Sequence, residues 1–110
     1  MTKKFSNLKQ KETMDCGPTC LSMISSFHGR NINIEKIRQY TQLGKEGVNL
    51  YGISDAAEKI GFRTLSVKIS FTKLIHEAPL PCIVHWEQNH FVVITPNSKL
   101  NKIEVADPAI

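Results

Sequence analysis

The sequence contains little cysteine and no long apolar run, and these two shortages exclude several classes of protein. Its 110 residues include three cysteines. An odd number cannot pair off in a disulfide framework, so we expect a reducing, cytosolic setting. The longest apolar run is 91–94, whereas a membrane-spanning helix needs about 20 residues. Residues 1–10 are polar and lack the hydrophobic region of a secretory signal. The sequence therefore predicts a single domain over residues 1–110.

The ligand sets of zinc sites and the aromatic-basic pattern of nucleic-acid binders are missing as well. Cys16 and Cys20 have no second cysteine pair and no His-x3-His pair to complete a metal site. The net charge is +4, and four lysines lie in the first eleven residues. A basic arm of this kind can touch phosphates or an anionic membrane. Without an arginine cluster or interleaved aromatics, we expect a solvated terminus, no metal and no nucleic-acid partner.

Helix signals dominate the first half of the chain. Apolar residues recur there at the spacing of one helix face, and proline or asparagine stands where a helix would begin. Glycines follow two of the stretches, as they do at helix C-termini. We expect helices over residues 17–28, 34–42 and 50–60, with Asn33 and Asn49 as N-caps, Gly29 and Gly61 at two C-terminal ends, and a loop over 44–47.

In the second half the pattern changes to the alternation that is typical of strands. The stretch 90–95 is apolar on both faces, so we expect it at the centre of the sheet. We expect strands over residues 62–69, 82–86, 90–95 and 102–107, and a short helix over 71–76 capped by Ser70. The predicted fold class is α+β, with helices packed on one face of an antiparallel sheet.

Cys16 stands directly before the first predicted helix and is followed by Gly17. A thiol at a helix N-terminus feels the positive end of the helix dipole and nearby unpaired N–H groups, which favour the nucleophilic thiolate. The neighbouring glycine lets a substrate backbone approach closely. The alternative is a buried, inert cysteine, and position alone does not separate the two. Cys20 and Cys82 lack such a setting, so we expect both to belong to the core.

A nucleophilic cysteine needs a base, and strand pairing selects one of the four histidines. If the last two predicted strands form a hairpin around a four-residue loop at 97–100, their apolar side chains can be buried on one face. The pairs on that face are then Ile94 with Ile103, Val92 with Val105, and His90 with Asp107. A slip by one residue would turn the apolar side chains to the opposite face. The register that buries them therefore also brings a carboxylate beside an imidazole. The alternative is that His90 and Asp107, as the last pair of the hairpin, are simply exposed to solvent.

Cys16, His90 and Asp107 together have the division of labour of a nucleophile, a base and the residue that orients the base. Acyl transfer also creates an oxyanion, which needs hydrogen-bond donors already in place. The backbone N–H of Cys16 is one candidate donor, and the side-chain amide of Gln10 is a second. A solvated Gln10 is the alternative. The residues therefore predict a site for acyl transfer to a thiol.

Three motifs occur in order along the chain: QKETMDCGPTCL over 10–21, NHFVV over 89–93, and DP over 107–108. The stretch 46–62 adds further matching positions. Together they resemble the double-glycine leader peptidase domain, the bacteriocin-processing cysteine peptidase of peptidase-containing ABC transporters. The resemblance extends over almost the entire chain.

The resemblance implies a papain-like cysteine peptidase fold, with Cys16 as nucleophile, His90 as base, Asp107 as its orienter and Gln10 in the oxyanion hole. It implies removal of the leader from a bacteriocin or similar exported peptide after a Gly-Gly type motif, without a cofactor. The implied partners are the leader-bearing precursor and the membrane and ATPase domains of an ABC transporter. The implied location is the cytoplasmic face of the bacterial membrane, with this segment itself soluble.

The chain departs from that family at its C-terminal end. Domains of the family usually continue beyond the Asp-Pro motif, whereas this sequence stops at Ile110. We therefore expect a truncated domain whose last strand is an exposed edge, with self-association or marginal stability as the result. Two other functions stay open. One is a catalytically inactive domain that only binds the leader peptide, and the other is a basic surface module for lipid or nucleic acid.

Overall fold

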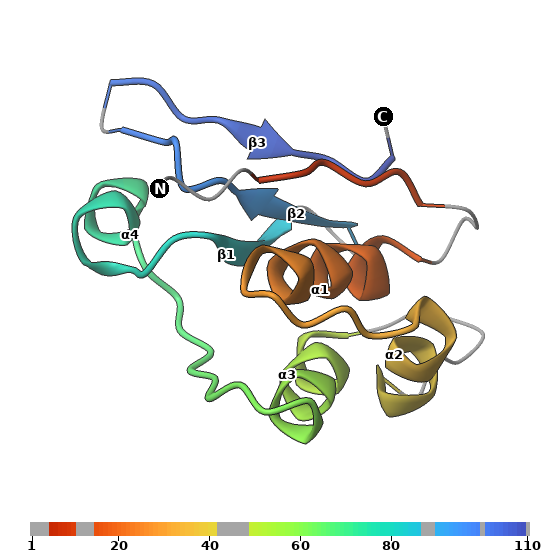
Figure 1. Ribbon diagram of the computed structural model, residues 1–110. Coiled ribbons are helices and arrows are strands. Elements are labelled where there is room, and N and C mark those ends of the chain that lie inside the picture. The colour runs from red at the N-terminus through yellow and green to blue at the C-terminus, as the bar shows by residue number, and fades with distance from the viewer. Residues whose placement is uncertain (1–4, 11–14, 42–48, 87–89, 100, 110) are drawn as a thin grey trace.

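Helices precede a small antiparallel sheet along the chain (Figure 1). The computed structural model describes residues 5–10, 15–41, 49–86, 90–99 and 101–109. Its helices are α1 (Cys16–Phe27), α2 (Ile34–Thr41), α3 (Leu50–Lys59) and α4 (Phe71–Glu77). Its strands are β1 (Cys82–Trp86), β2 (His90–Ile94) and β3 (Val105–Ala106), and they form a sheet in the order β1-β2-β3.

These helices begin and end close to where the sequence predicts them, because the signals at their ends are local. Asn33 and Asn49 each accept a backbone N–H of the first helical turn through the side-chain oxygen, both at 2.8 Å. Gly29 and Gly61 have φ angles of 79° and 104°, which glycine adopts without strain. The predicted loop over 44–47 lies outside the described residues. The cap residues thus fix the ends of the helical half of the molecule.

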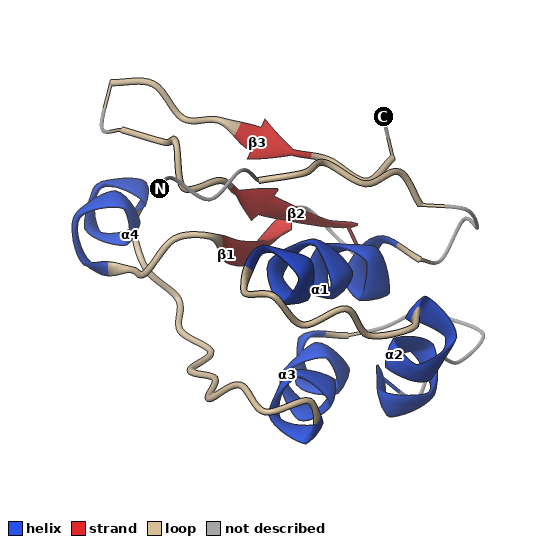
Figure 2. Cartoon of the chain, in the orientation of Figure 1, coloured by secondary structure: helices blue, strands red, loops and turns tan. Residues whose placement is uncertain are grey.

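The predicted strand over 62–69 is wrong. These residues connect α3 to α4 without regular secondary structure (Figure 2). Leu65 and Val67, which alternate with polar residues in this stretch and so suggested one buried face, are 85% and 55% exposed. Alternating polarity indicates which side chains would share a face, but a strand also needs a neighbour for its backbone hydrogen bonds. Among the described residues the sheet contains only β1, β2 and β3, and none of them pairs with this segment.

β2 is the central strand of the sheet, as its apolar character on both faces predicts. It pairs with β1 along its length, from Cys82 opposite Ile94 to Trp86 opposite His90. Its residues 91–94 are all at most 3% exposed. The helix α1 packs onto it, and the Cys20 thiol donates a hydrogen bond to the backbone oxygen of Phe91 at 3.3 Å. Figure 1 shows α1 between the sheet and the helices α2 and α3, so the predicted α+β layering is confirmed.

The predicted register of the last hairpin is wrong by two residues. Ile94 pairs with Val105 rather than with Ile103, and the regular part of the last strand is shorter than predicted. The connection holds more residues than a four-residue loop. It contains a turn in which Ser98 N–H donates to the oxygen of Thr95, and a tip at the bridge between residues 99 and 102. An even shift keeps every side chain on its face, so the faces of the two strands are as predicted.

The segment before α1 lies against the segment after β3. The backbone N–H of Gln10 donates to the oxygen of Pro108 at 2.8 Å. Figure 1 shows residues 5–10 running along this side of the molecule. The N-terminal segment thus bonds to the chain just after β3, whereas Val105 of β3 itself is 46% exposed. The described structure and the relatives give no support to the expected self-association.

Two apolar clusters hold the layers together. The first joins α1 to the sheet and the second joins α1 to α2 and α3. Buried members of the first are Cys16, Cys20, Met23, Ile53, Phe91, Val93 and Ala106. Those of the second are Leu21, Ile37, Ala56 and Ala57. Within the described ranges, no helix combines the length and the apolar character that crossing a bilayer requires.

Candidate active site

The sheet brings His90 and Asp107 into direct contact. The Nε2 atom of His90 lies 2.9 Å from Oδ1 of Asp107, and the two side chains are 32% and 25% exposed. The same carboxylate oxygen accepts the backbone N–H of Ala109 at 2.9 Å. The even register shift explains why the pair forms. It leaves both residues on the predicted face, as diagonal neighbours rather than as a direct pair, and long side chains span that separation.

Cys16 is the first residue of α1 and is 8% exposed. It belongs to the apolar cluster that includes Phe91 and Ala106. Phe91 follows His90 directly in the sequence, and Ala106 directly precedes Asp107. Figure 1 shows the start of α1, the start of β2 and the segment after β3 at the same end of the molecule. The shared cluster therefore places the Cys16 backbone at the end of the sheet that carries the histidine and the carboxylate.

The other two cysteines are parts of the packing. Cys20 is 0% exposed. Burial is the main cause that raises the pKa of its thiol, and the nearby Cys16 and Asp107 raise it further. Burial raises the pKa of Cys82 to about 11. At neutral pH both thiols are therefore protonated and poor nucleophiles.

Gln10 comes to the same end of the molecule from the N-terminal segment. Its backbone N–H bonds to Pro108, the residue after Asp107, and its side-chain Oε1 is buried. Gln10 as a whole is half-buried, so its side chain is not fully solvated as in the alternative. Its backbone bond to Pro108 places the residue beside the Asp-Pro motif.

The remaining histidines have other surroundings. His28 caps the C-terminal end of α1, where its ring packs between Phe27 and Phe62. His76 lies on the surface of α4. His85 stacks on Phe91, with ring centroids 4.7 Å apart. In the part of the chain that the structure describes, no three His, Cys, Asp or Glu side chains are grouped as metal ligands.

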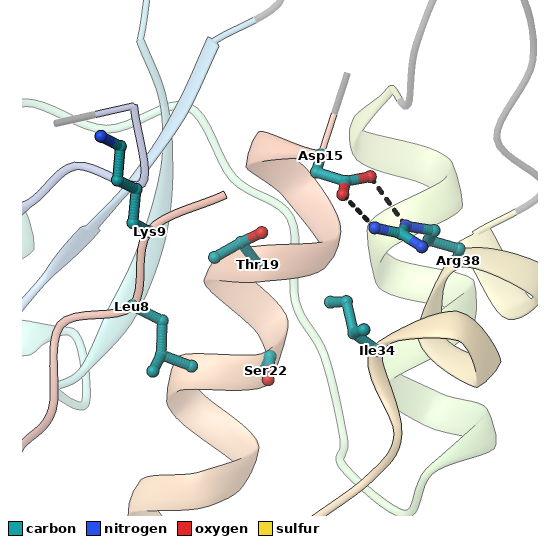
Figure 3. A pocket seen from close by; sticks show the side chains of 7 residues that line it. All are labelled: Leu8, Lys9, Asp15, Thr19, Ser22, Ile34 and Arg38. Atoms are coloured by element: carbon teal, nitrogen blue, oxygen red, sulfur yellow. Dashed lines mark hydrogen bonds and ion pairs between the residues drawn. The ribbon is translucent and has the colours of Figure 1, made fainter. Parts of the chain in front are cut away.

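Sequence reasoning missed an ion pair beside Cys16. Asp15 is 1% exposed, and its carboxylate accepts two hydrogen bonds from Arg38 of α2 (Figure 3). The Nε to Oδ1 distance is 2.9 Å, and a second guanidinium nitrogen bonds to Oδ2. A pocket of about 170 Å³ lies beside the pair, lined by Leu8, Lys9, Asp15, Thr19, Ser22, Ile34 and Arg38. The only signal was the carboxylate directly before the cysteine, and nothing in the α2 pattern marked Arg38 as its partner.

The chain is similar to known proteins along almost its whole length. The model of the Peptidase C39 family matches residues 4–110. A probable microcin-H47 secretion/processing ATP-binding protein of Escherichia coli is 37% identical over 102 residues. The colicin V secretion/processing ATP-binding protein of Escherichia coli is 36% identical over 102 residues. Both alignments cover 93% of this chain but 14% of the relative, so the chain spans about one seventh of the length of these proteins.

Solved structures of peptidase domains from such transporters are also similar to this chain. The peptidase domain of Streptococcus ComA, a bi-functional ABC transporter, matches with a TM-score of 0.84 and 31% identity, over 96% of this chain and 80% of that one. A double glycine motif protease from an AMS/PCAT transporter, solved in complex with the leader peptide, matches with a TM-score of 0.89 and 29% identity, over 97% and 76%. The family resemblance and the fold class predicted from the three motifs are therefore confirmed.

Proposed function

Because the chain belongs to the Peptidase C39 family, we propose that it is a cysteine endopeptidase that removes the leader of a bacteriocin or similar exported peptide after a Gly-Gly type motif. The names of its relatives, which combine secretion with processing, support this substrate class. So does the leader peptide bound to the structural neighbour. The observation that carries the catalytic part is the hydrogen bond between His90 and Asp107 at the end of the sheet where α1 begins with Cys16.

The proposed mechanism follows from which ring nitrogen faces the carboxylate. With Asp107 accepting from Nε2, that nitrogen carries the proton, and Nδ1 of His90 is the basic one. Nδ1 takes the thiol proton of Cys16, and the thiolate attacks the carbonyl carbon of the scissile bond. The imidazolium then gives its proton to the leaving amine as the carbon–nitrogen bond breaks. Water, deprotonated by Nδ1, hydrolyses the resulting thioester and regenerates the thiol.

The tetrahedral intermediates carry a negative oxygen that needs donors. The backbone N–H of Cys16 lies in the first turn of α1, at the positive end of the helix dipole. We assign it as one donor and the side-chain N–H of Gln10 as the other. Both would act on the oxygen only after attack has begun, so they favour the transition state over the bound substrate. This chemistry is complete without a metal ion or an organic cofactor.

The proposed setting is the peptidase part of a peptide exporter. The curated relatives are ATP-binding secretion proteins several times longer than this chain. We propose the membrane and ATPase domains of such a transporter as partners, with cleavage on the cytoplasmic face of the membrane. A catalytically inactive leader-binding domain is the competing function, and the next experiment separates the two.

Iodoacetamide should stop cleavage of a Gly-Gly leader peptide in step with alkylation of Cys16. An activated thiol reacts at neutral pH, whereas Cys82, with its pKa raised to about 11, reacts slowly there and faster as the pH approaches that value. Mass spectrometry of the alkylated peptides measures the three cysteines separately, and fluorescence of a labelled leader peptide measures cleavage. Cys20 and Cys82 serve as internal controls. Equal alkylation rates at Cys16 and Cys82, with leader binding retained, would favour the inactive binding domain.

Replacing Asp107 by alanine should lower kcat by on the order of 10²-fold, because His90 loses the group that fixes its tautomer and ring orientation. KM should change little, because the proposed role of Asp107 is to orient His90 and not to bind the peptide. The matched control is Glu104→Ala in the same hairpin. Glu104 bonds to Thr95 Oγ1 at 2.8 Å and not to the histidine. Equal losses in the two variants would mean that the hairpin, rather than the Asp107 carboxylate, limits the rate.

A further inference from the structure

We propose that the Asp15–Arg38 ion pair is a positioning pair that sets the direction of the Cys16 thiol and backbone N–H. This inference deepens the proposed function and rests on it. Asp15 and Cys16 share one peptide unit, so any rotation of Asp15 is passed to both groups that act on the substrate. The pair ties that peptide unit to α2, a helix that carries none of the proposed catalytic residues.

The contacts of Asp15 show that it does not serve as an ordinary helix cap. A residue in its position normally accepts a backbone N–H of the first helical turn through its side chain. Asp15 makes no such bond, and its carboxylate bonds to Arg38 instead. Its backbone oxygen accepts the N–H of Thr19 at 2.9 Å. The side chain of Asp15 is thus held by α2, and its backbone oxygen is held within the first turn of α1. The peptide unit between Asp15 and Cys16 is therefore constrained by both helices.

Stability alone is a poor explanation for this arrangement. Burying two charges costs desolvation energy that offsets most of their attraction, and neutral packing of similar size often does equally well. What a two-bond arginine–carboxylate contact adds is direction, because the planar fork fits one orientation of the carboxylate. The molecule also contains an ion pair without that property. Lys59 and Asp55 of α3 lie 2.9 Å apart, with side chains 44% and 33% exposed.

The experiment compares Arg38→Gln, Arg38→Lys and the double variant Asp15→Asn/Arg38→Gln, with Lys59→Gln as matched control. Misplacement of a reacting group by about 1 Å can cost 10²-fold in rate. We therefore expect a 10- to 100-fold lower kcat in both variants that contain Arg38→Gln, with KM within about twofold. Arg38→Lys keeps the charge but not the fork, and we expect an intermediate loss. Lys59→Gln should behave as wild type.

Alkylation of the three cysteines distinguishes positioning from folding. The Cys16 rate should fall about tenfold or more relative to Cys82. Cys20, which is 0% exposed, should stay protected because the fold is intact. Arg38→Gln alone leaves the Asp15 carboxylate buried without its partner and can prevent folding. The double variant removes both charges, so it tests the positioning role even if Arg38→Gln does not fold.

Two results would overturn the inference. One is an unchanged kcat and Cys16 rate in the double variant. The other is alkylation of Cys20 that rises together with that of Cys16 in both glutamine variants, which would make the pair a structural contact only. If the wild-type chain cleaves no leader peptide, the proposed function fails separately, and the alkylation ratios still decide whether the pair directs Cys16.

Discussion

Cys16→Ala is expected to lower leader-peptide cleavage by about 10⁴-fold or more, since the variant has no atom that can form the acyl intermediate. The oxyanion donors and the bound substrate geometry account for whatever rate remains. Leader binding should be unchanged within about twofold, because the lost sulfur lies at the scissile bond and not along the leader. Cleavage followed by mass spectrometry and binding followed by fluorescence anisotropy give the two values.

Cys82→Ala is the matched control for this variant. Its thiol is protonated at neutral pH, and it lies at the start of β1 rather than at the start of α1. We expect wild-type cleavage from it. If Cys16→Ala cleaves the leader as fast as Cys82→Ala, the chain is not a thiol peptidase acting through Cys16, and the basic surface module returns as a candidate.

His90→Ala is expected to lower kcat by on the order of 10³- to 10⁴-fold, because both proton transfers of the proposed mechanism pass through its ring. Asp107 acts through the same ring. The double variant His90→Ala/Asp107→Ala should therefore be no slower than His90→Ala alone, whereas two independent contributions would multiply. Steady-state cleavage by the single and double variants measures this coupling directly.

The control for His90 is His85→Ala. The His85 ring stacks on Phe91 in the same sheet. Removing it therefore measures how much a disturbance in the packing of Phe91 lowers cleavage. A small effect is expected. A loss as large as that of His90→Ala would assign the effect to the packing of the sheet. Rate losses that multiply in the double variant would show that Asp107 does not act through His90.

The sequence was most informative where a signal and its structure lie a few residues apart. Asn49 caps α3 and Gly61 ends it, because each acts on the backbone of its own turn. The segment 62–69 shows the opposite case. Its residues alternate as they would in a strand, but whether a partner strand lies beside it depends on distant parts of the chain, and a local pattern carries no information on them.

The candidate site was predictable to a limited degree for the same reason. The contact between His90 and Asp107 was predicted from burial of apolar side chains, and it holds although the register differs by two, because an even shift preserves the face. Residues 95–98 (TPNS) mark a turn, but they do not fix how many residues the connection holds, and that number sets the register. The bond between Arg38 and Asp15 joins two helices, and a lone arginine on a helix gives no sign of its partner.

The bond between Gln10 and Pro108 joins positions near opposite ends of the chain, and the proposed site draws residues from both. During translation, the proposed site can therefore assemble only after residue 108 has left the ribosome exit tunnel. In the growing polypeptide, Cys16 is synthesised long before His90 and Asp107, the residues proposed to activate it.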